Sequence, residues 1–350
     1  MTAQQKAFFL LEKHGTYAVG QNDILKPGPG ELLVEIHSTS LNPVDWKIKI
    51  HDIFVEGYPA VLGTDSAGIV KEVGEGVTEF AVGDRVLHQG YFDNRHATFQ
   101  QYTLVPAEIT AKIPENMTFD QASTIPLVLA TAACGLYNDK ISLNGGAALT
   151  APWLEGGRNK YAGRSIVIIG GASSVGQMVL QVARLSGFSP IIATASACHE
   201  AYLKSLGATH VLPRETVPLS SLASELQKMV SEPIRLVYDS ISEPETQNAA
   251  YDVLAPGGQL ILVLPPLISA AKLTDDKEII YVFGNVHHPA QRAVGVALYK
   301  NMTELLRTGE IKPNNIEVIP GGLNGIFCAL EKLEAGVSAL KLVAHPQETP

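Results

Sequence analysis

The sequence predicts a two-domain α/β protein, and three observations support this prediction. The chain has 350 residues, enough for about two domains at roughly 100–200 residues each. Residues 1–124 read as short strands between Gly, Pro and Asp turns, which is typical of a small barrel or sandwich. Between 125 and 285, apolar strands alternate with helices, which indicates βαβ units in a parallel sheet.

Composition excludes several classes of protein. The chain carries 26 Lys+Arg against 35 Asp+Glu, a net charge of −9, so it lacks the basic surface of a nucleic-acid binder. The apolar run near the N-terminus is too short for a signal peptide or a membrane span, which predicts a soluble, cytoplasmic protein. Three cysteines lie far apart without a C-x-x-C pair, so neither a disulfide framework nor a thiolate zinc site is expected.

The elements follow from local patterns. In the first part, β-branched and apolar runs at 32–41, 66–74 and 84–89 are separated by glycine and proline turns. In the second part we expect strands at 165–169, 190–193, 235–238 and 259–264, with helices over 175–185, up to 206 and over 245–254. Helices at about 290–308 and 322–335 and a Lys-Leu-Val strand close the chain. The glycine-rich stretch 144–163 has no periodicity and is interpreted as a surface loop or a substrate lid.

The most informative segment is the turn that follows the strand at 165–169. It contains Gly170, Gly171, Ser173, Ser174, Val175 and Gly176. Glycines let a backbone turn sharply and approach a pyrophosphate, whose charge is stabilised by the amides that open the next helix. This variant of G-x-G-x-x-G lies between a strand and a helix, so it predicts a dinucleotide site.

The end of the second strand bears on which dinucleotide binds. NAD sites place an Asp or Glu there for the ribose 2′-hydroxyl. This chain has no carboxylate in that position before Glu200. Ser196, His199 and Arg214 could instead contact a 2′-phosphate, so the pattern favours NADP(H) over NAD.

Together these motifs resemble the medium-chain dehydrogenases/reductases. The segments Asn-Pro-Val-Asp-Trp-Lys at 42–47, Gly-Thr-Asp-Ser-Ala-Gly at 63–68 and Val-Gly-Asp-Arg-Val at 82–86 resemble their GroES-like half, and the glycine turn and Pro-Gly-Gly at 256–258 resemble their Rossmann half. The resemblance implies a GroES-like barrel from residues 1–124 and 286–350, with a Rossmann domain over 125–285.

The resemblance also bears on zinc. Zinc alcohol dehydrogenases place a Cys where this chain has residues 42–45, a His-Glu where it has 63–65, and four cysteines near position 100, where this chain has none. His88, His96 and Asp65 remain as ligand candidates without a matching motif. We therefore expect no metal.

Among the zinc-free members, the chain looks most like fungal trans-acting enoyl reductases and their quinone oxidoreductase relatives. That resemblance implies dinucleotide contacts from Val44, Asp45, Trp46, Lys47, Gly171, Ser173, Ser174, Val175, Gly176, Ser196, His199, Arg214, Val263, Leu264, Leu340 and Lys341. It implies substrate contacts from Thr131, Cys134, Tyr137, Phe283, Gly284 and Asn285.

The expected activity is NADPH-dependent hydride transfer to an activated C=C bond or a quinone, without a metal. The enolate that develops needs a cation or hydrogen-bond donor, and Lys47, Thr131, Tyr58 and Tyr137 are candidates, of which Lys47 and Thr131 are the catalytic prediction. Lys47 could instead simply bind the dinucleotide. The alternatives are an NADP-dependent alcohol dehydrogenase and a catalytically silent NADPH-binding partner protein. The substrate would be a small molecule or a thioester, with a carrier protein or synthase as partner, and the protein a monomer or homodimer.

Overall fold

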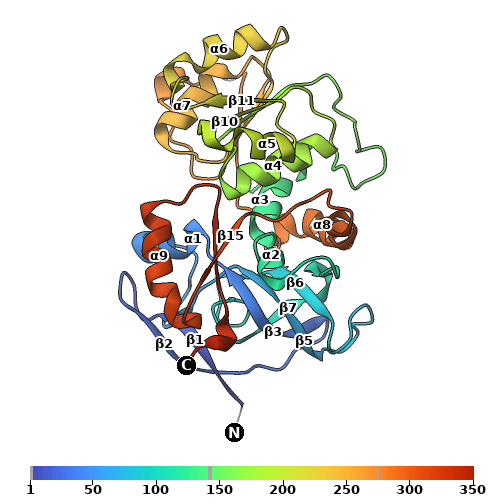
Figure 1. The fold of residues 1–350 in the computed structure, drawn as a ribbon, viewed down its shortest axis with the longest axis vertical. Coiled ribbons are helices and arrows are strands. Elements are labelled where there is room, and N and C mark those ends of the chain that lie inside the picture. Colours follow the sequence, from blue (N-terminus) through green and yellow to red (C-terminus); the bar gives the residue numbers. More distant parts are fainter. Residues whose placement is uncertain (1–2, 141–143, 275) are drawn as a thin grey trace. The chain divides into compact units, whose positions relative to one another are not determined.

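The computed structural model describes residues 3–140, 144–274 and 276–350, and these form two compact units (Figure 1). Unit 1 consists of Met1–Leu127, Tyr299–Thr308 and Pro313–Pro350, and unit 2 of Val128–Leu298 and Gly309–Lys312. The second boundary therefore lies within a long helix rather than at the predicted position 285. Two helices contain residues of both units: α3 (Pro126–Tyr137) and α8 (Pro289–Arg307).

Unit 1 is built on two sheets. Three strands pair in the order β2-β1-β4, and a larger sheet runs β15-β16-β3-β5-β6-β8, with β7 pairing to β3. The strands are β1 (Gln4–Leu10), β2 (Tyr17–Asp23), β3 (Glu31–Ser40), β4 (Ala60–Val61), β5 (Asp65–Val73), β6 (Arg85–Gln89), β7 (Tyr102–Pro106), β8 (Thr110–Lys112), β15 (Ile316–Ile319) and β16 (Lys341–Ala344). A core of buried apolar residues that includes Phe8, Ile48, Phe99 and Leu342 stabilises this unit.

Unit 1 also contains three helices. Two of them, α1 (Pro43–His51) and α2 (Phe119–Ser123), lie within residues 1–124, and the third, α9 (Ile326–Ala335), lies near the end of the chain. The sequence analysis, which described residues 1–124 as strands and turns, predicted no helix at α1. Pro43 occupies the first turn of this helix, where its missing N–H costs nothing, and the Asn42 amide donates to the Asp45 carboxylate at 2.7 Å.

Unit 2 is a six-stranded parallel sheet in the order β11-β10-β9-β12-β13-β14. Its strands are β9 (Ile166–Ile169), β10 (Ile191–Ala195), β11 (His210–Pro213), β12 (Leu236–Asp239), β13 (Gln259–Leu262) and β14 (Glu278–Tyr281), and its further helices are α4 (Ser174–Leu185), α5 (Glu200–Leu206), α6 (Leu222–Met229) and α7 (Pro244–Val253). β9 is fully buried, which is why its sequence is an unbroken apolar run. The predicted fold class, a GroES-like domain with a Rossmann-type parallel sheet, is confirmed.

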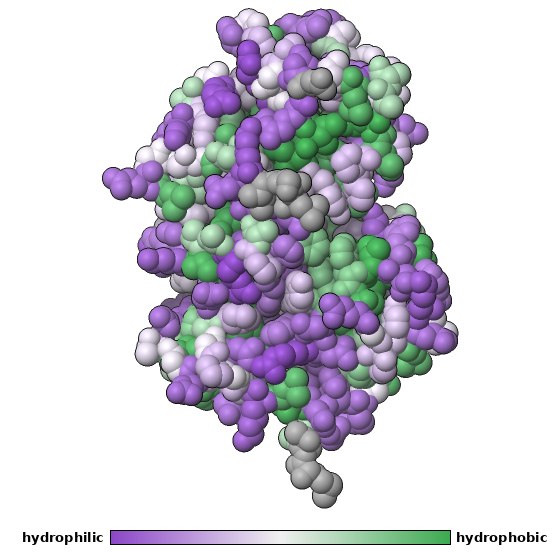
Figure 2. Space-filling model, turned by 180° about the vertical axis from the view of Figure 1, so that it is seen from behind, coloured by the Kyte–Doolittle hydropathy of each residue, from purple (hydrophilic) through white to green (hydrophobic). Residues whose placement is uncertain are grey.

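The surface of the molecule is mostly hydrophilic on the face seen in Figure 2, with hydrophobic side chains gathered in smaller patches. Val82 and Leu267 are among the exposed large apolar side chains, at 65% and 58%. Within the described ranges, no helix has the length and apolar character needed to cross a membrane.

Candidate functional site: a dinucleotide edge and a buried polar cluster

The carboxyl edge of the parallel sheet in unit 2 gathers most of the predicted dinucleotide residues. The chain passes from β9 to β10 on one side of the sheet and later returns to β12 on the other side, so the strand order reverses between β9 and β12. Open parallel sheets bind ligands at the carboxyl edge beside such a reversal. The glycine turn follows β9, and the other predicted segments follow the neighbouring strands.

The glycine turn is held by hydrogen bonds from three sides. Gly170 has a φ of +77°, a conformation that favours glycine. The Gly171 amide donates to the Thr194 carbonyl at 2.9 Å, which ties the turn to the end of β10. The Ser173 hydroxyl caps α4 by accepting from the Gly176 amide at 3.0 Å and donates to Ser240, which follows β12.

Gly176 lies where the helix approaches the turn most closely. A Cβ on this residue would lie 2.3 Å from the Gly170 carbonyl oxygen and 2.9 Å from the Gly171 Cα. Ser174 and Val175 form the first turn of α4 beside it. Glycine at this position therefore lets the start of α4 pack against the turn, and a glycine turn that leads directly into a helix fits the pyrophosphate of a dinucleotide.

The residues predicted to contact the 2′-position lie where β10 and β11 end. Ser196 precedes a 3₁₀ turn after β10, and His199 is the last residue of that turn. Arg214 follows β11, with its side chain 72% exposed. The structure adds a residue that the sequence analysis missed. The Glu215 carboxylate accepts from the Ala197 amide at 3.2 Å, and the nearby Ser196 hydroxyl helps to lower its pKa.

Two further predicted segments lie at the same edge. Val263 and Leu264 follow β13, and the Val263 amide donates to the Ser242 hydroxyl, which lies beyond β12, at 2.9 Å. Phe283, Gly284 and Asn285 follow β14. Their contacts bear on the substrate side of the site.

Thr131 and Gly284 lie in contact. A Cβ on Gly284 would lie 2.4 Å from the Thr131 hydroxyl oxygen, so the backbone of the 283–285 segment packs directly on this side chain. Asn285 is fully buried, and its amide donates to Gln291 at 2.8 Å. The structure thus brings Thr131 together with the segment after β14.

Tyr137 and Cys134 do not join this group. The Tyr137 hydroxyl bonds to Ser186 at 2.7 Å and to the Val182 carbonyl at 3.2 Å, at the carboxyl end of α4. The glycine turn lies at the other end of this 12-residue helix, about 18 Å away at 1.5 Å per residue. The Cys134 thiol has no exposed surface, and burial raises its pKa. Both side chains belong to the core of unit 2.

The 144–163 loop is fastened at that same carboxyl end of α4. The Asn159 and Tyr161 amides donate to the Leu185 and Ser186 carbonyls at 3.1 and 3.0 Å, and the Tyr161 ring stacks on Phe188. Trp153 packs edge-on against Tyr137. These contacts hold this part of the loop at the end of α4 that lies away from the glycine turn.

Unit 1 contains a buried polar cluster centred on Asp65. One oxygen of this carboxylate accepts from the Lys341 ammonium at 3.0 Å, the Asn42 side-chain amide at 2.7 Å and the Ser40 hydroxyl at 2.9 Å. The other oxygen accepts from the Leu127 amide at 2.7 Å. The side chains of Lys341 and Asp65 are 2% and 0% exposed. Lys341, predicted to line the dinucleotide beside Leu340, is therefore enclosed by its ion pair.

The predicted residues on α1 divide into inward and outward side chains. Asp45, the third residue of the helix, is fully buried, and burial raises its pKa to about 8. Its carboxyl accepts from the Asn42 amide, and this hydrogen bond stabilises the helix start. Val44, Trp46 and Lys47 are partly exposed, and the Lys47 ammonium lies 5.4 Å from the centre of the Trp46 ring.

The donors at the position of the zinc ligands do not fit zinc. The segments 42–45 and 63–65 meet, since the Asn42 side-chain amide lies 3.2 Å from the Thr64 hydroxyl. They offer no thiolate or imidazole, and their two carboxyl groups are already bonded, Asp45 to the Asn42 amide and Asp65 to the Lys341 ammonium. His88 is buried, which lowers its pKa to about 4, and its ring contacts the Gln89 carbonyl. Across the described residues, no three His, Cys, Asp or Glu side chains converge as ligands would.

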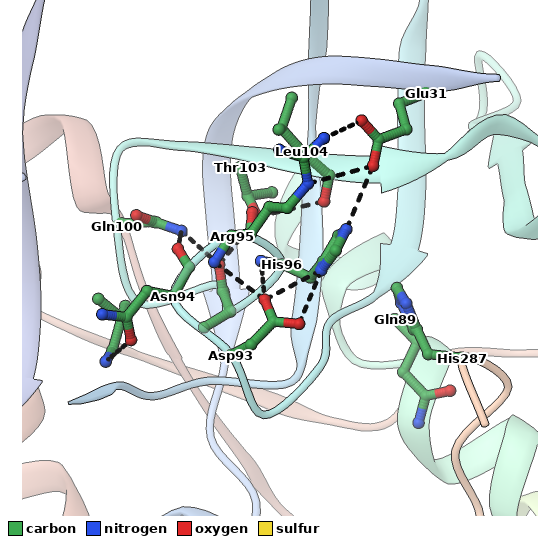
Figure 3. A network of polar contacts seen from close by, with 12 residues as sticks. Glu31, Gln89, Asp93, Asn94, Arg95, His96, Gln100, Thr103, Leu104 and His287 are labelled. Atoms are coloured by element: carbon green, nitrogen blue, oxygen red, sulfur yellow. Dashed lines mark hydrogen bonds and ion pairs between the residues drawn. The ribbon is translucent and has the colours of Figure 1, made fainter. Parts of the chain in front are cut away.

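A charged network holds the segment around position 95, where zinc alcohol dehydrogenases carry four cysteines (Figure 3). The Asp93 carboxylate accepts from the Arg95 and His96 amides at 2.9 and 2.8 Å and contacts the His96 ring at 2.9 Å. Arg95 also pairs with Glu31 on β3. Hydrogen bonds and ion pairs thus fix the conformation of this loop.

An open hollow of about 580 Å³ lies in unit 1, and no sequence pattern predicted it. Its walls include the stacked rings of Phe54 and Phe92, with Tyr58 nearby. The Tyr58 hydroxyl donates to Asp52 at 2.7 Å, and this bond raises its pKa to about 12. Tyr58 is thereby a poor proton donor at neutral pH.

Comparisons with known proteins match both halves of the chain. Residues 28–115 match the alcohol dehydrogenase GroES-like domain, and residues 174–303 match the family described as zinc-binding dehydrogenase. A trans-enoyl reductase of Aspergillus japonicus, himH, is 33% identical over 89% of each chain, and one of a Penicillium species, grgB, is 29% identical over 94% of this chain and 95% of its own.

Among solved structures, a putative zinc-dependent alcohol dehydrogenase from Rhizobium etli superposes with a TM-score of 0.78 at 25% identity, covering 99% of both chains. The paired domains, the glycine turn at the strand-order reversal and these matches agree along nearly the whole sequence. The chain belongs to the medium-chain dehydrogenase/reductase family.

Proposed function

We propose that this protein is an NADPH-dependent reductase that delivers hydride to an activated C=C bond, of an enone or enoyl thioester, or to a quinone, without a metal. The proposal rests on the contrast between two sites. The glycine turn between β9 and α4 has the form of a dinucleotide site, whereas the donors at 42–45 and 63–65 do not fit zinc. Trans-enoyl reductases among the relatives support it. The family's parallel-sheet domain binds a nicotinamide dinucleotide, which supplies the hydride when bound.

The protein's own residues would bind the dinucleotide and stabilise charge on the substrate. Transfer of hydride to the β-carbon places negative charge on the carbonyl oxygen, and a proton then reaches the α-carbon. Thr131 could donate a hydrogen bond to that oxygen, because its hydroxyl lies against Gly284 at the sheet edge. Lys47 could supply a positive charge, or bind the dinucleotide instead.

The preference for NADPH rests on the end of β10. Ser196 and His199 supply polar groups there, and the exposed guanidinium of Arg214 follows the adjacent strand. A substrate carried as a thioester, by coenzyme A or by the carrier protein of a synthase, fits the relatives' enoyl reductase names.

The test is a spectrophotometric screen. Purified protein is mixed with NADPH and each of a panel of quinones, enals, enones and enoyl thioesters, and loss of absorbance at the nicotinamide band is followed. We expect turnover with at least one enone or enoyl compound. NADPH binding without turnover on any of them would indicate a silent binding protein, and alcohol-driven NADP⁺ reduction with stoichiometric zinc would indicate an alcohol dehydrogenase.

Lys47→Met separates the two roles of Lys47, with Lys49→Met on the same helix as the matched control. If Lys47 stabilises the enolate, kcat falls by at least about tenfold at saturating NADPH. If it only binds the dinucleotide, the KM for NADPH rises and kcat is unchanged.

A further inference from the structure

The carboxylate of Glu215 lies beside the segment that follows β10, in which the sequence has no acid before Glu200. β10 and β11 pair in parallel with Ala195 opposite Pro213, and the Arg214 amide donates to the Ala195 carbonyl at 2.9 Å. The two residues after β11 are thereby placed alongside the residues after β10. Glu215, two residues beyond β11, therefore contacts the segment after β10. In dinucleotide-binding sheets this segment binds the ribose.

The contacts of Glu215 use groups that a 2′-phosphate would need. Its carboxylate accepts from the Ala197 amide at 3.2 Å and lies near the Ser196 hydroxyl. Arg214 lies beside it, with its Nε 3.8 Å from a carboxylate oxygen. Hydrogen bonds from its own backbone amide, Ser196 and Ala197, together with the Arg214 charge, hold the pKa of Glu215 below its usual range, so the group is ionised at neutral pH.

We propose that Glu215 is the residue that limits the preference for NADPH over NADH, by placing a negative charge and competing for Ser196 and Ala197 at the 2′-position. A 2′-phosphate carries nearly two negative charges and must displace the carboxylate from its donors. The 2′-hydroxyl of NADH, in contrast, can donate to the same carboxylate. This inference rests on the proposed function, since it concerns the cofactor of that reaction.

The charge of Glu215 acts through water, because its side chain is 51% exposed. At such a position the repulsion between a carboxylate and a phosphate is moderate and depends on salt. We therefore expect neutralisation of Glu215 to change the ratio of the two dissociation constants by roughly three- to tenfold, with a smaller change in concentrated salt.

The experiment compares Glu215→Gln with wild type and with Glu200→Gln. Glu200 lies at the start of α5 and pairs with Lys204, with a side chain 46% exposed, so its substitution changes the net charge equally without touching Ser196. NADPH and NADH are each titrated against the full-length protein by calorimetry, at about 0.05 M and 1 M salt. Glu215→Gln should bind NADPH at least threefold more tightly relative to NADH, mainly at low salt, whereas Glu200→Gln should change the ratio less than twofold.

The outcomes separate the two proposals. If wild type binds a dinucleotide but Glu215→Gln leaves the ratio unchanged, lowers it, or changes it no more than Glu200→Gln does, Glu215 does not set the preference, and the reductase proposal stands. If wild type binds neither dinucleotide, both proposals fail.

Discussion

The ion pair between Lys341 and Asp65 yields a quantitative prediction for the stability of unit 1. Replacing Lys341 by Met keeps most of the apolar stem but removes the ammonium, which leaves the carboxylate of Asp65 buried and without its cation. Breaking a buried ion pair from one side costs about 3–5 kcal/mol. Asp65 keeps hydrogen bonds from Ser40, Asn42 and Leu127, so we expect the lower end, about 3 kcal/mol.

The assay uses the placement of the two tryptophans. Trp46 lies in unit 1 and Trp153 in unit 2, so a Trp153→Phe background leaves fluorescence that reports on unit 1 alone. Urea unfolding followed through Trp46 gives the free energy for Lys341→Met and for the control Lys332→Met. Lys332 pairs with Glu317 on the surface, with side chains 45% and 40% exposed, and should cost less than about 1 kcal/mol.

A double variant, Asp65→Asn with Lys341→Met, completes the test. Because removing both charges leaves no unpaired ion, its loss should be smaller than the sum of the single losses by at least about 1.5 kcal/mol. A loss below about 1 kcal/mol for Lys341→Met, or a double variant whose loss equals that sum, would refute the argument that a buried, coupled pair stabilises this cluster.

Three other predictions concern the turn, the metal and pH. Gly176→Ala should weaken NADPH binding at least tenfold in a titration and also lower the unfolding midpoint, because its Cβ would clash with the backbone of Gly170. Ser174→Ala, which removes only a hydroxyl, is the mild control. A Gly176→Ala variant with the wild-type Kd would mean that the pyrophosphate binds elsewhere. Elemental analysis should find far less than one zinc per chain, and one tightly bound zinc would contradict the donor argument. Burial depresses the pKa of His88 to about 4, so the unfolded state binds a proton at higher pH than the folded state does. The unfolding free energy should therefore fall by about 3 kcal/mol as pH drops from about 6.5 to 4. If the urea midpoint of His88→Gln falls with pH as steeply as that of wild type, His88 is not the origin of this dependence.

The sequence could predict the elements of unit 2 because their signals are local. An apolar run, a glycine turn and an amphipathic stretch place a strand at 165–169 and a helix at 175–185, and the structure has β9 and α4 within a residue of these bounds. Helix α1 was missed because it is short and lies among strands. Its signal was nevertheless present, since Asn42, Pro43 and Asp45 stand at the cap, first and third positions of a helix start.

Contacts between distant segments could not be predicted in this way. Lys341 and Asp65 are 276 positions apart, and no local pattern shows that β16 and β5 bring them together. Tyr137 shows the same limit on a shorter scale. It shares a helix with Thr131, yet its hydroxyl bonds to Ser186 at the carboxyl end of α4, because six residues along a helix shift a side chain by about 9 Å.

Glu215 shows why the rule for cofactor preference needs the sheet as well as the sequence. The rule examines the residues after the second strand for an acid, and by that criterion the segment from Ser196 to His199 favours NADPH. In a parallel sheet, however, the ends of adjacent strands lie side by side, and the register of β10 with β11 brings the carboxylate of Glu215 to the Ala197 amide. An acid at this position can therefore come from either strand. We therefore expect cofactor preference in this chain to depend on the balance between Arg214, which would attract a 2′-phosphate, and its immediate neighbour Glu215, which would repel one.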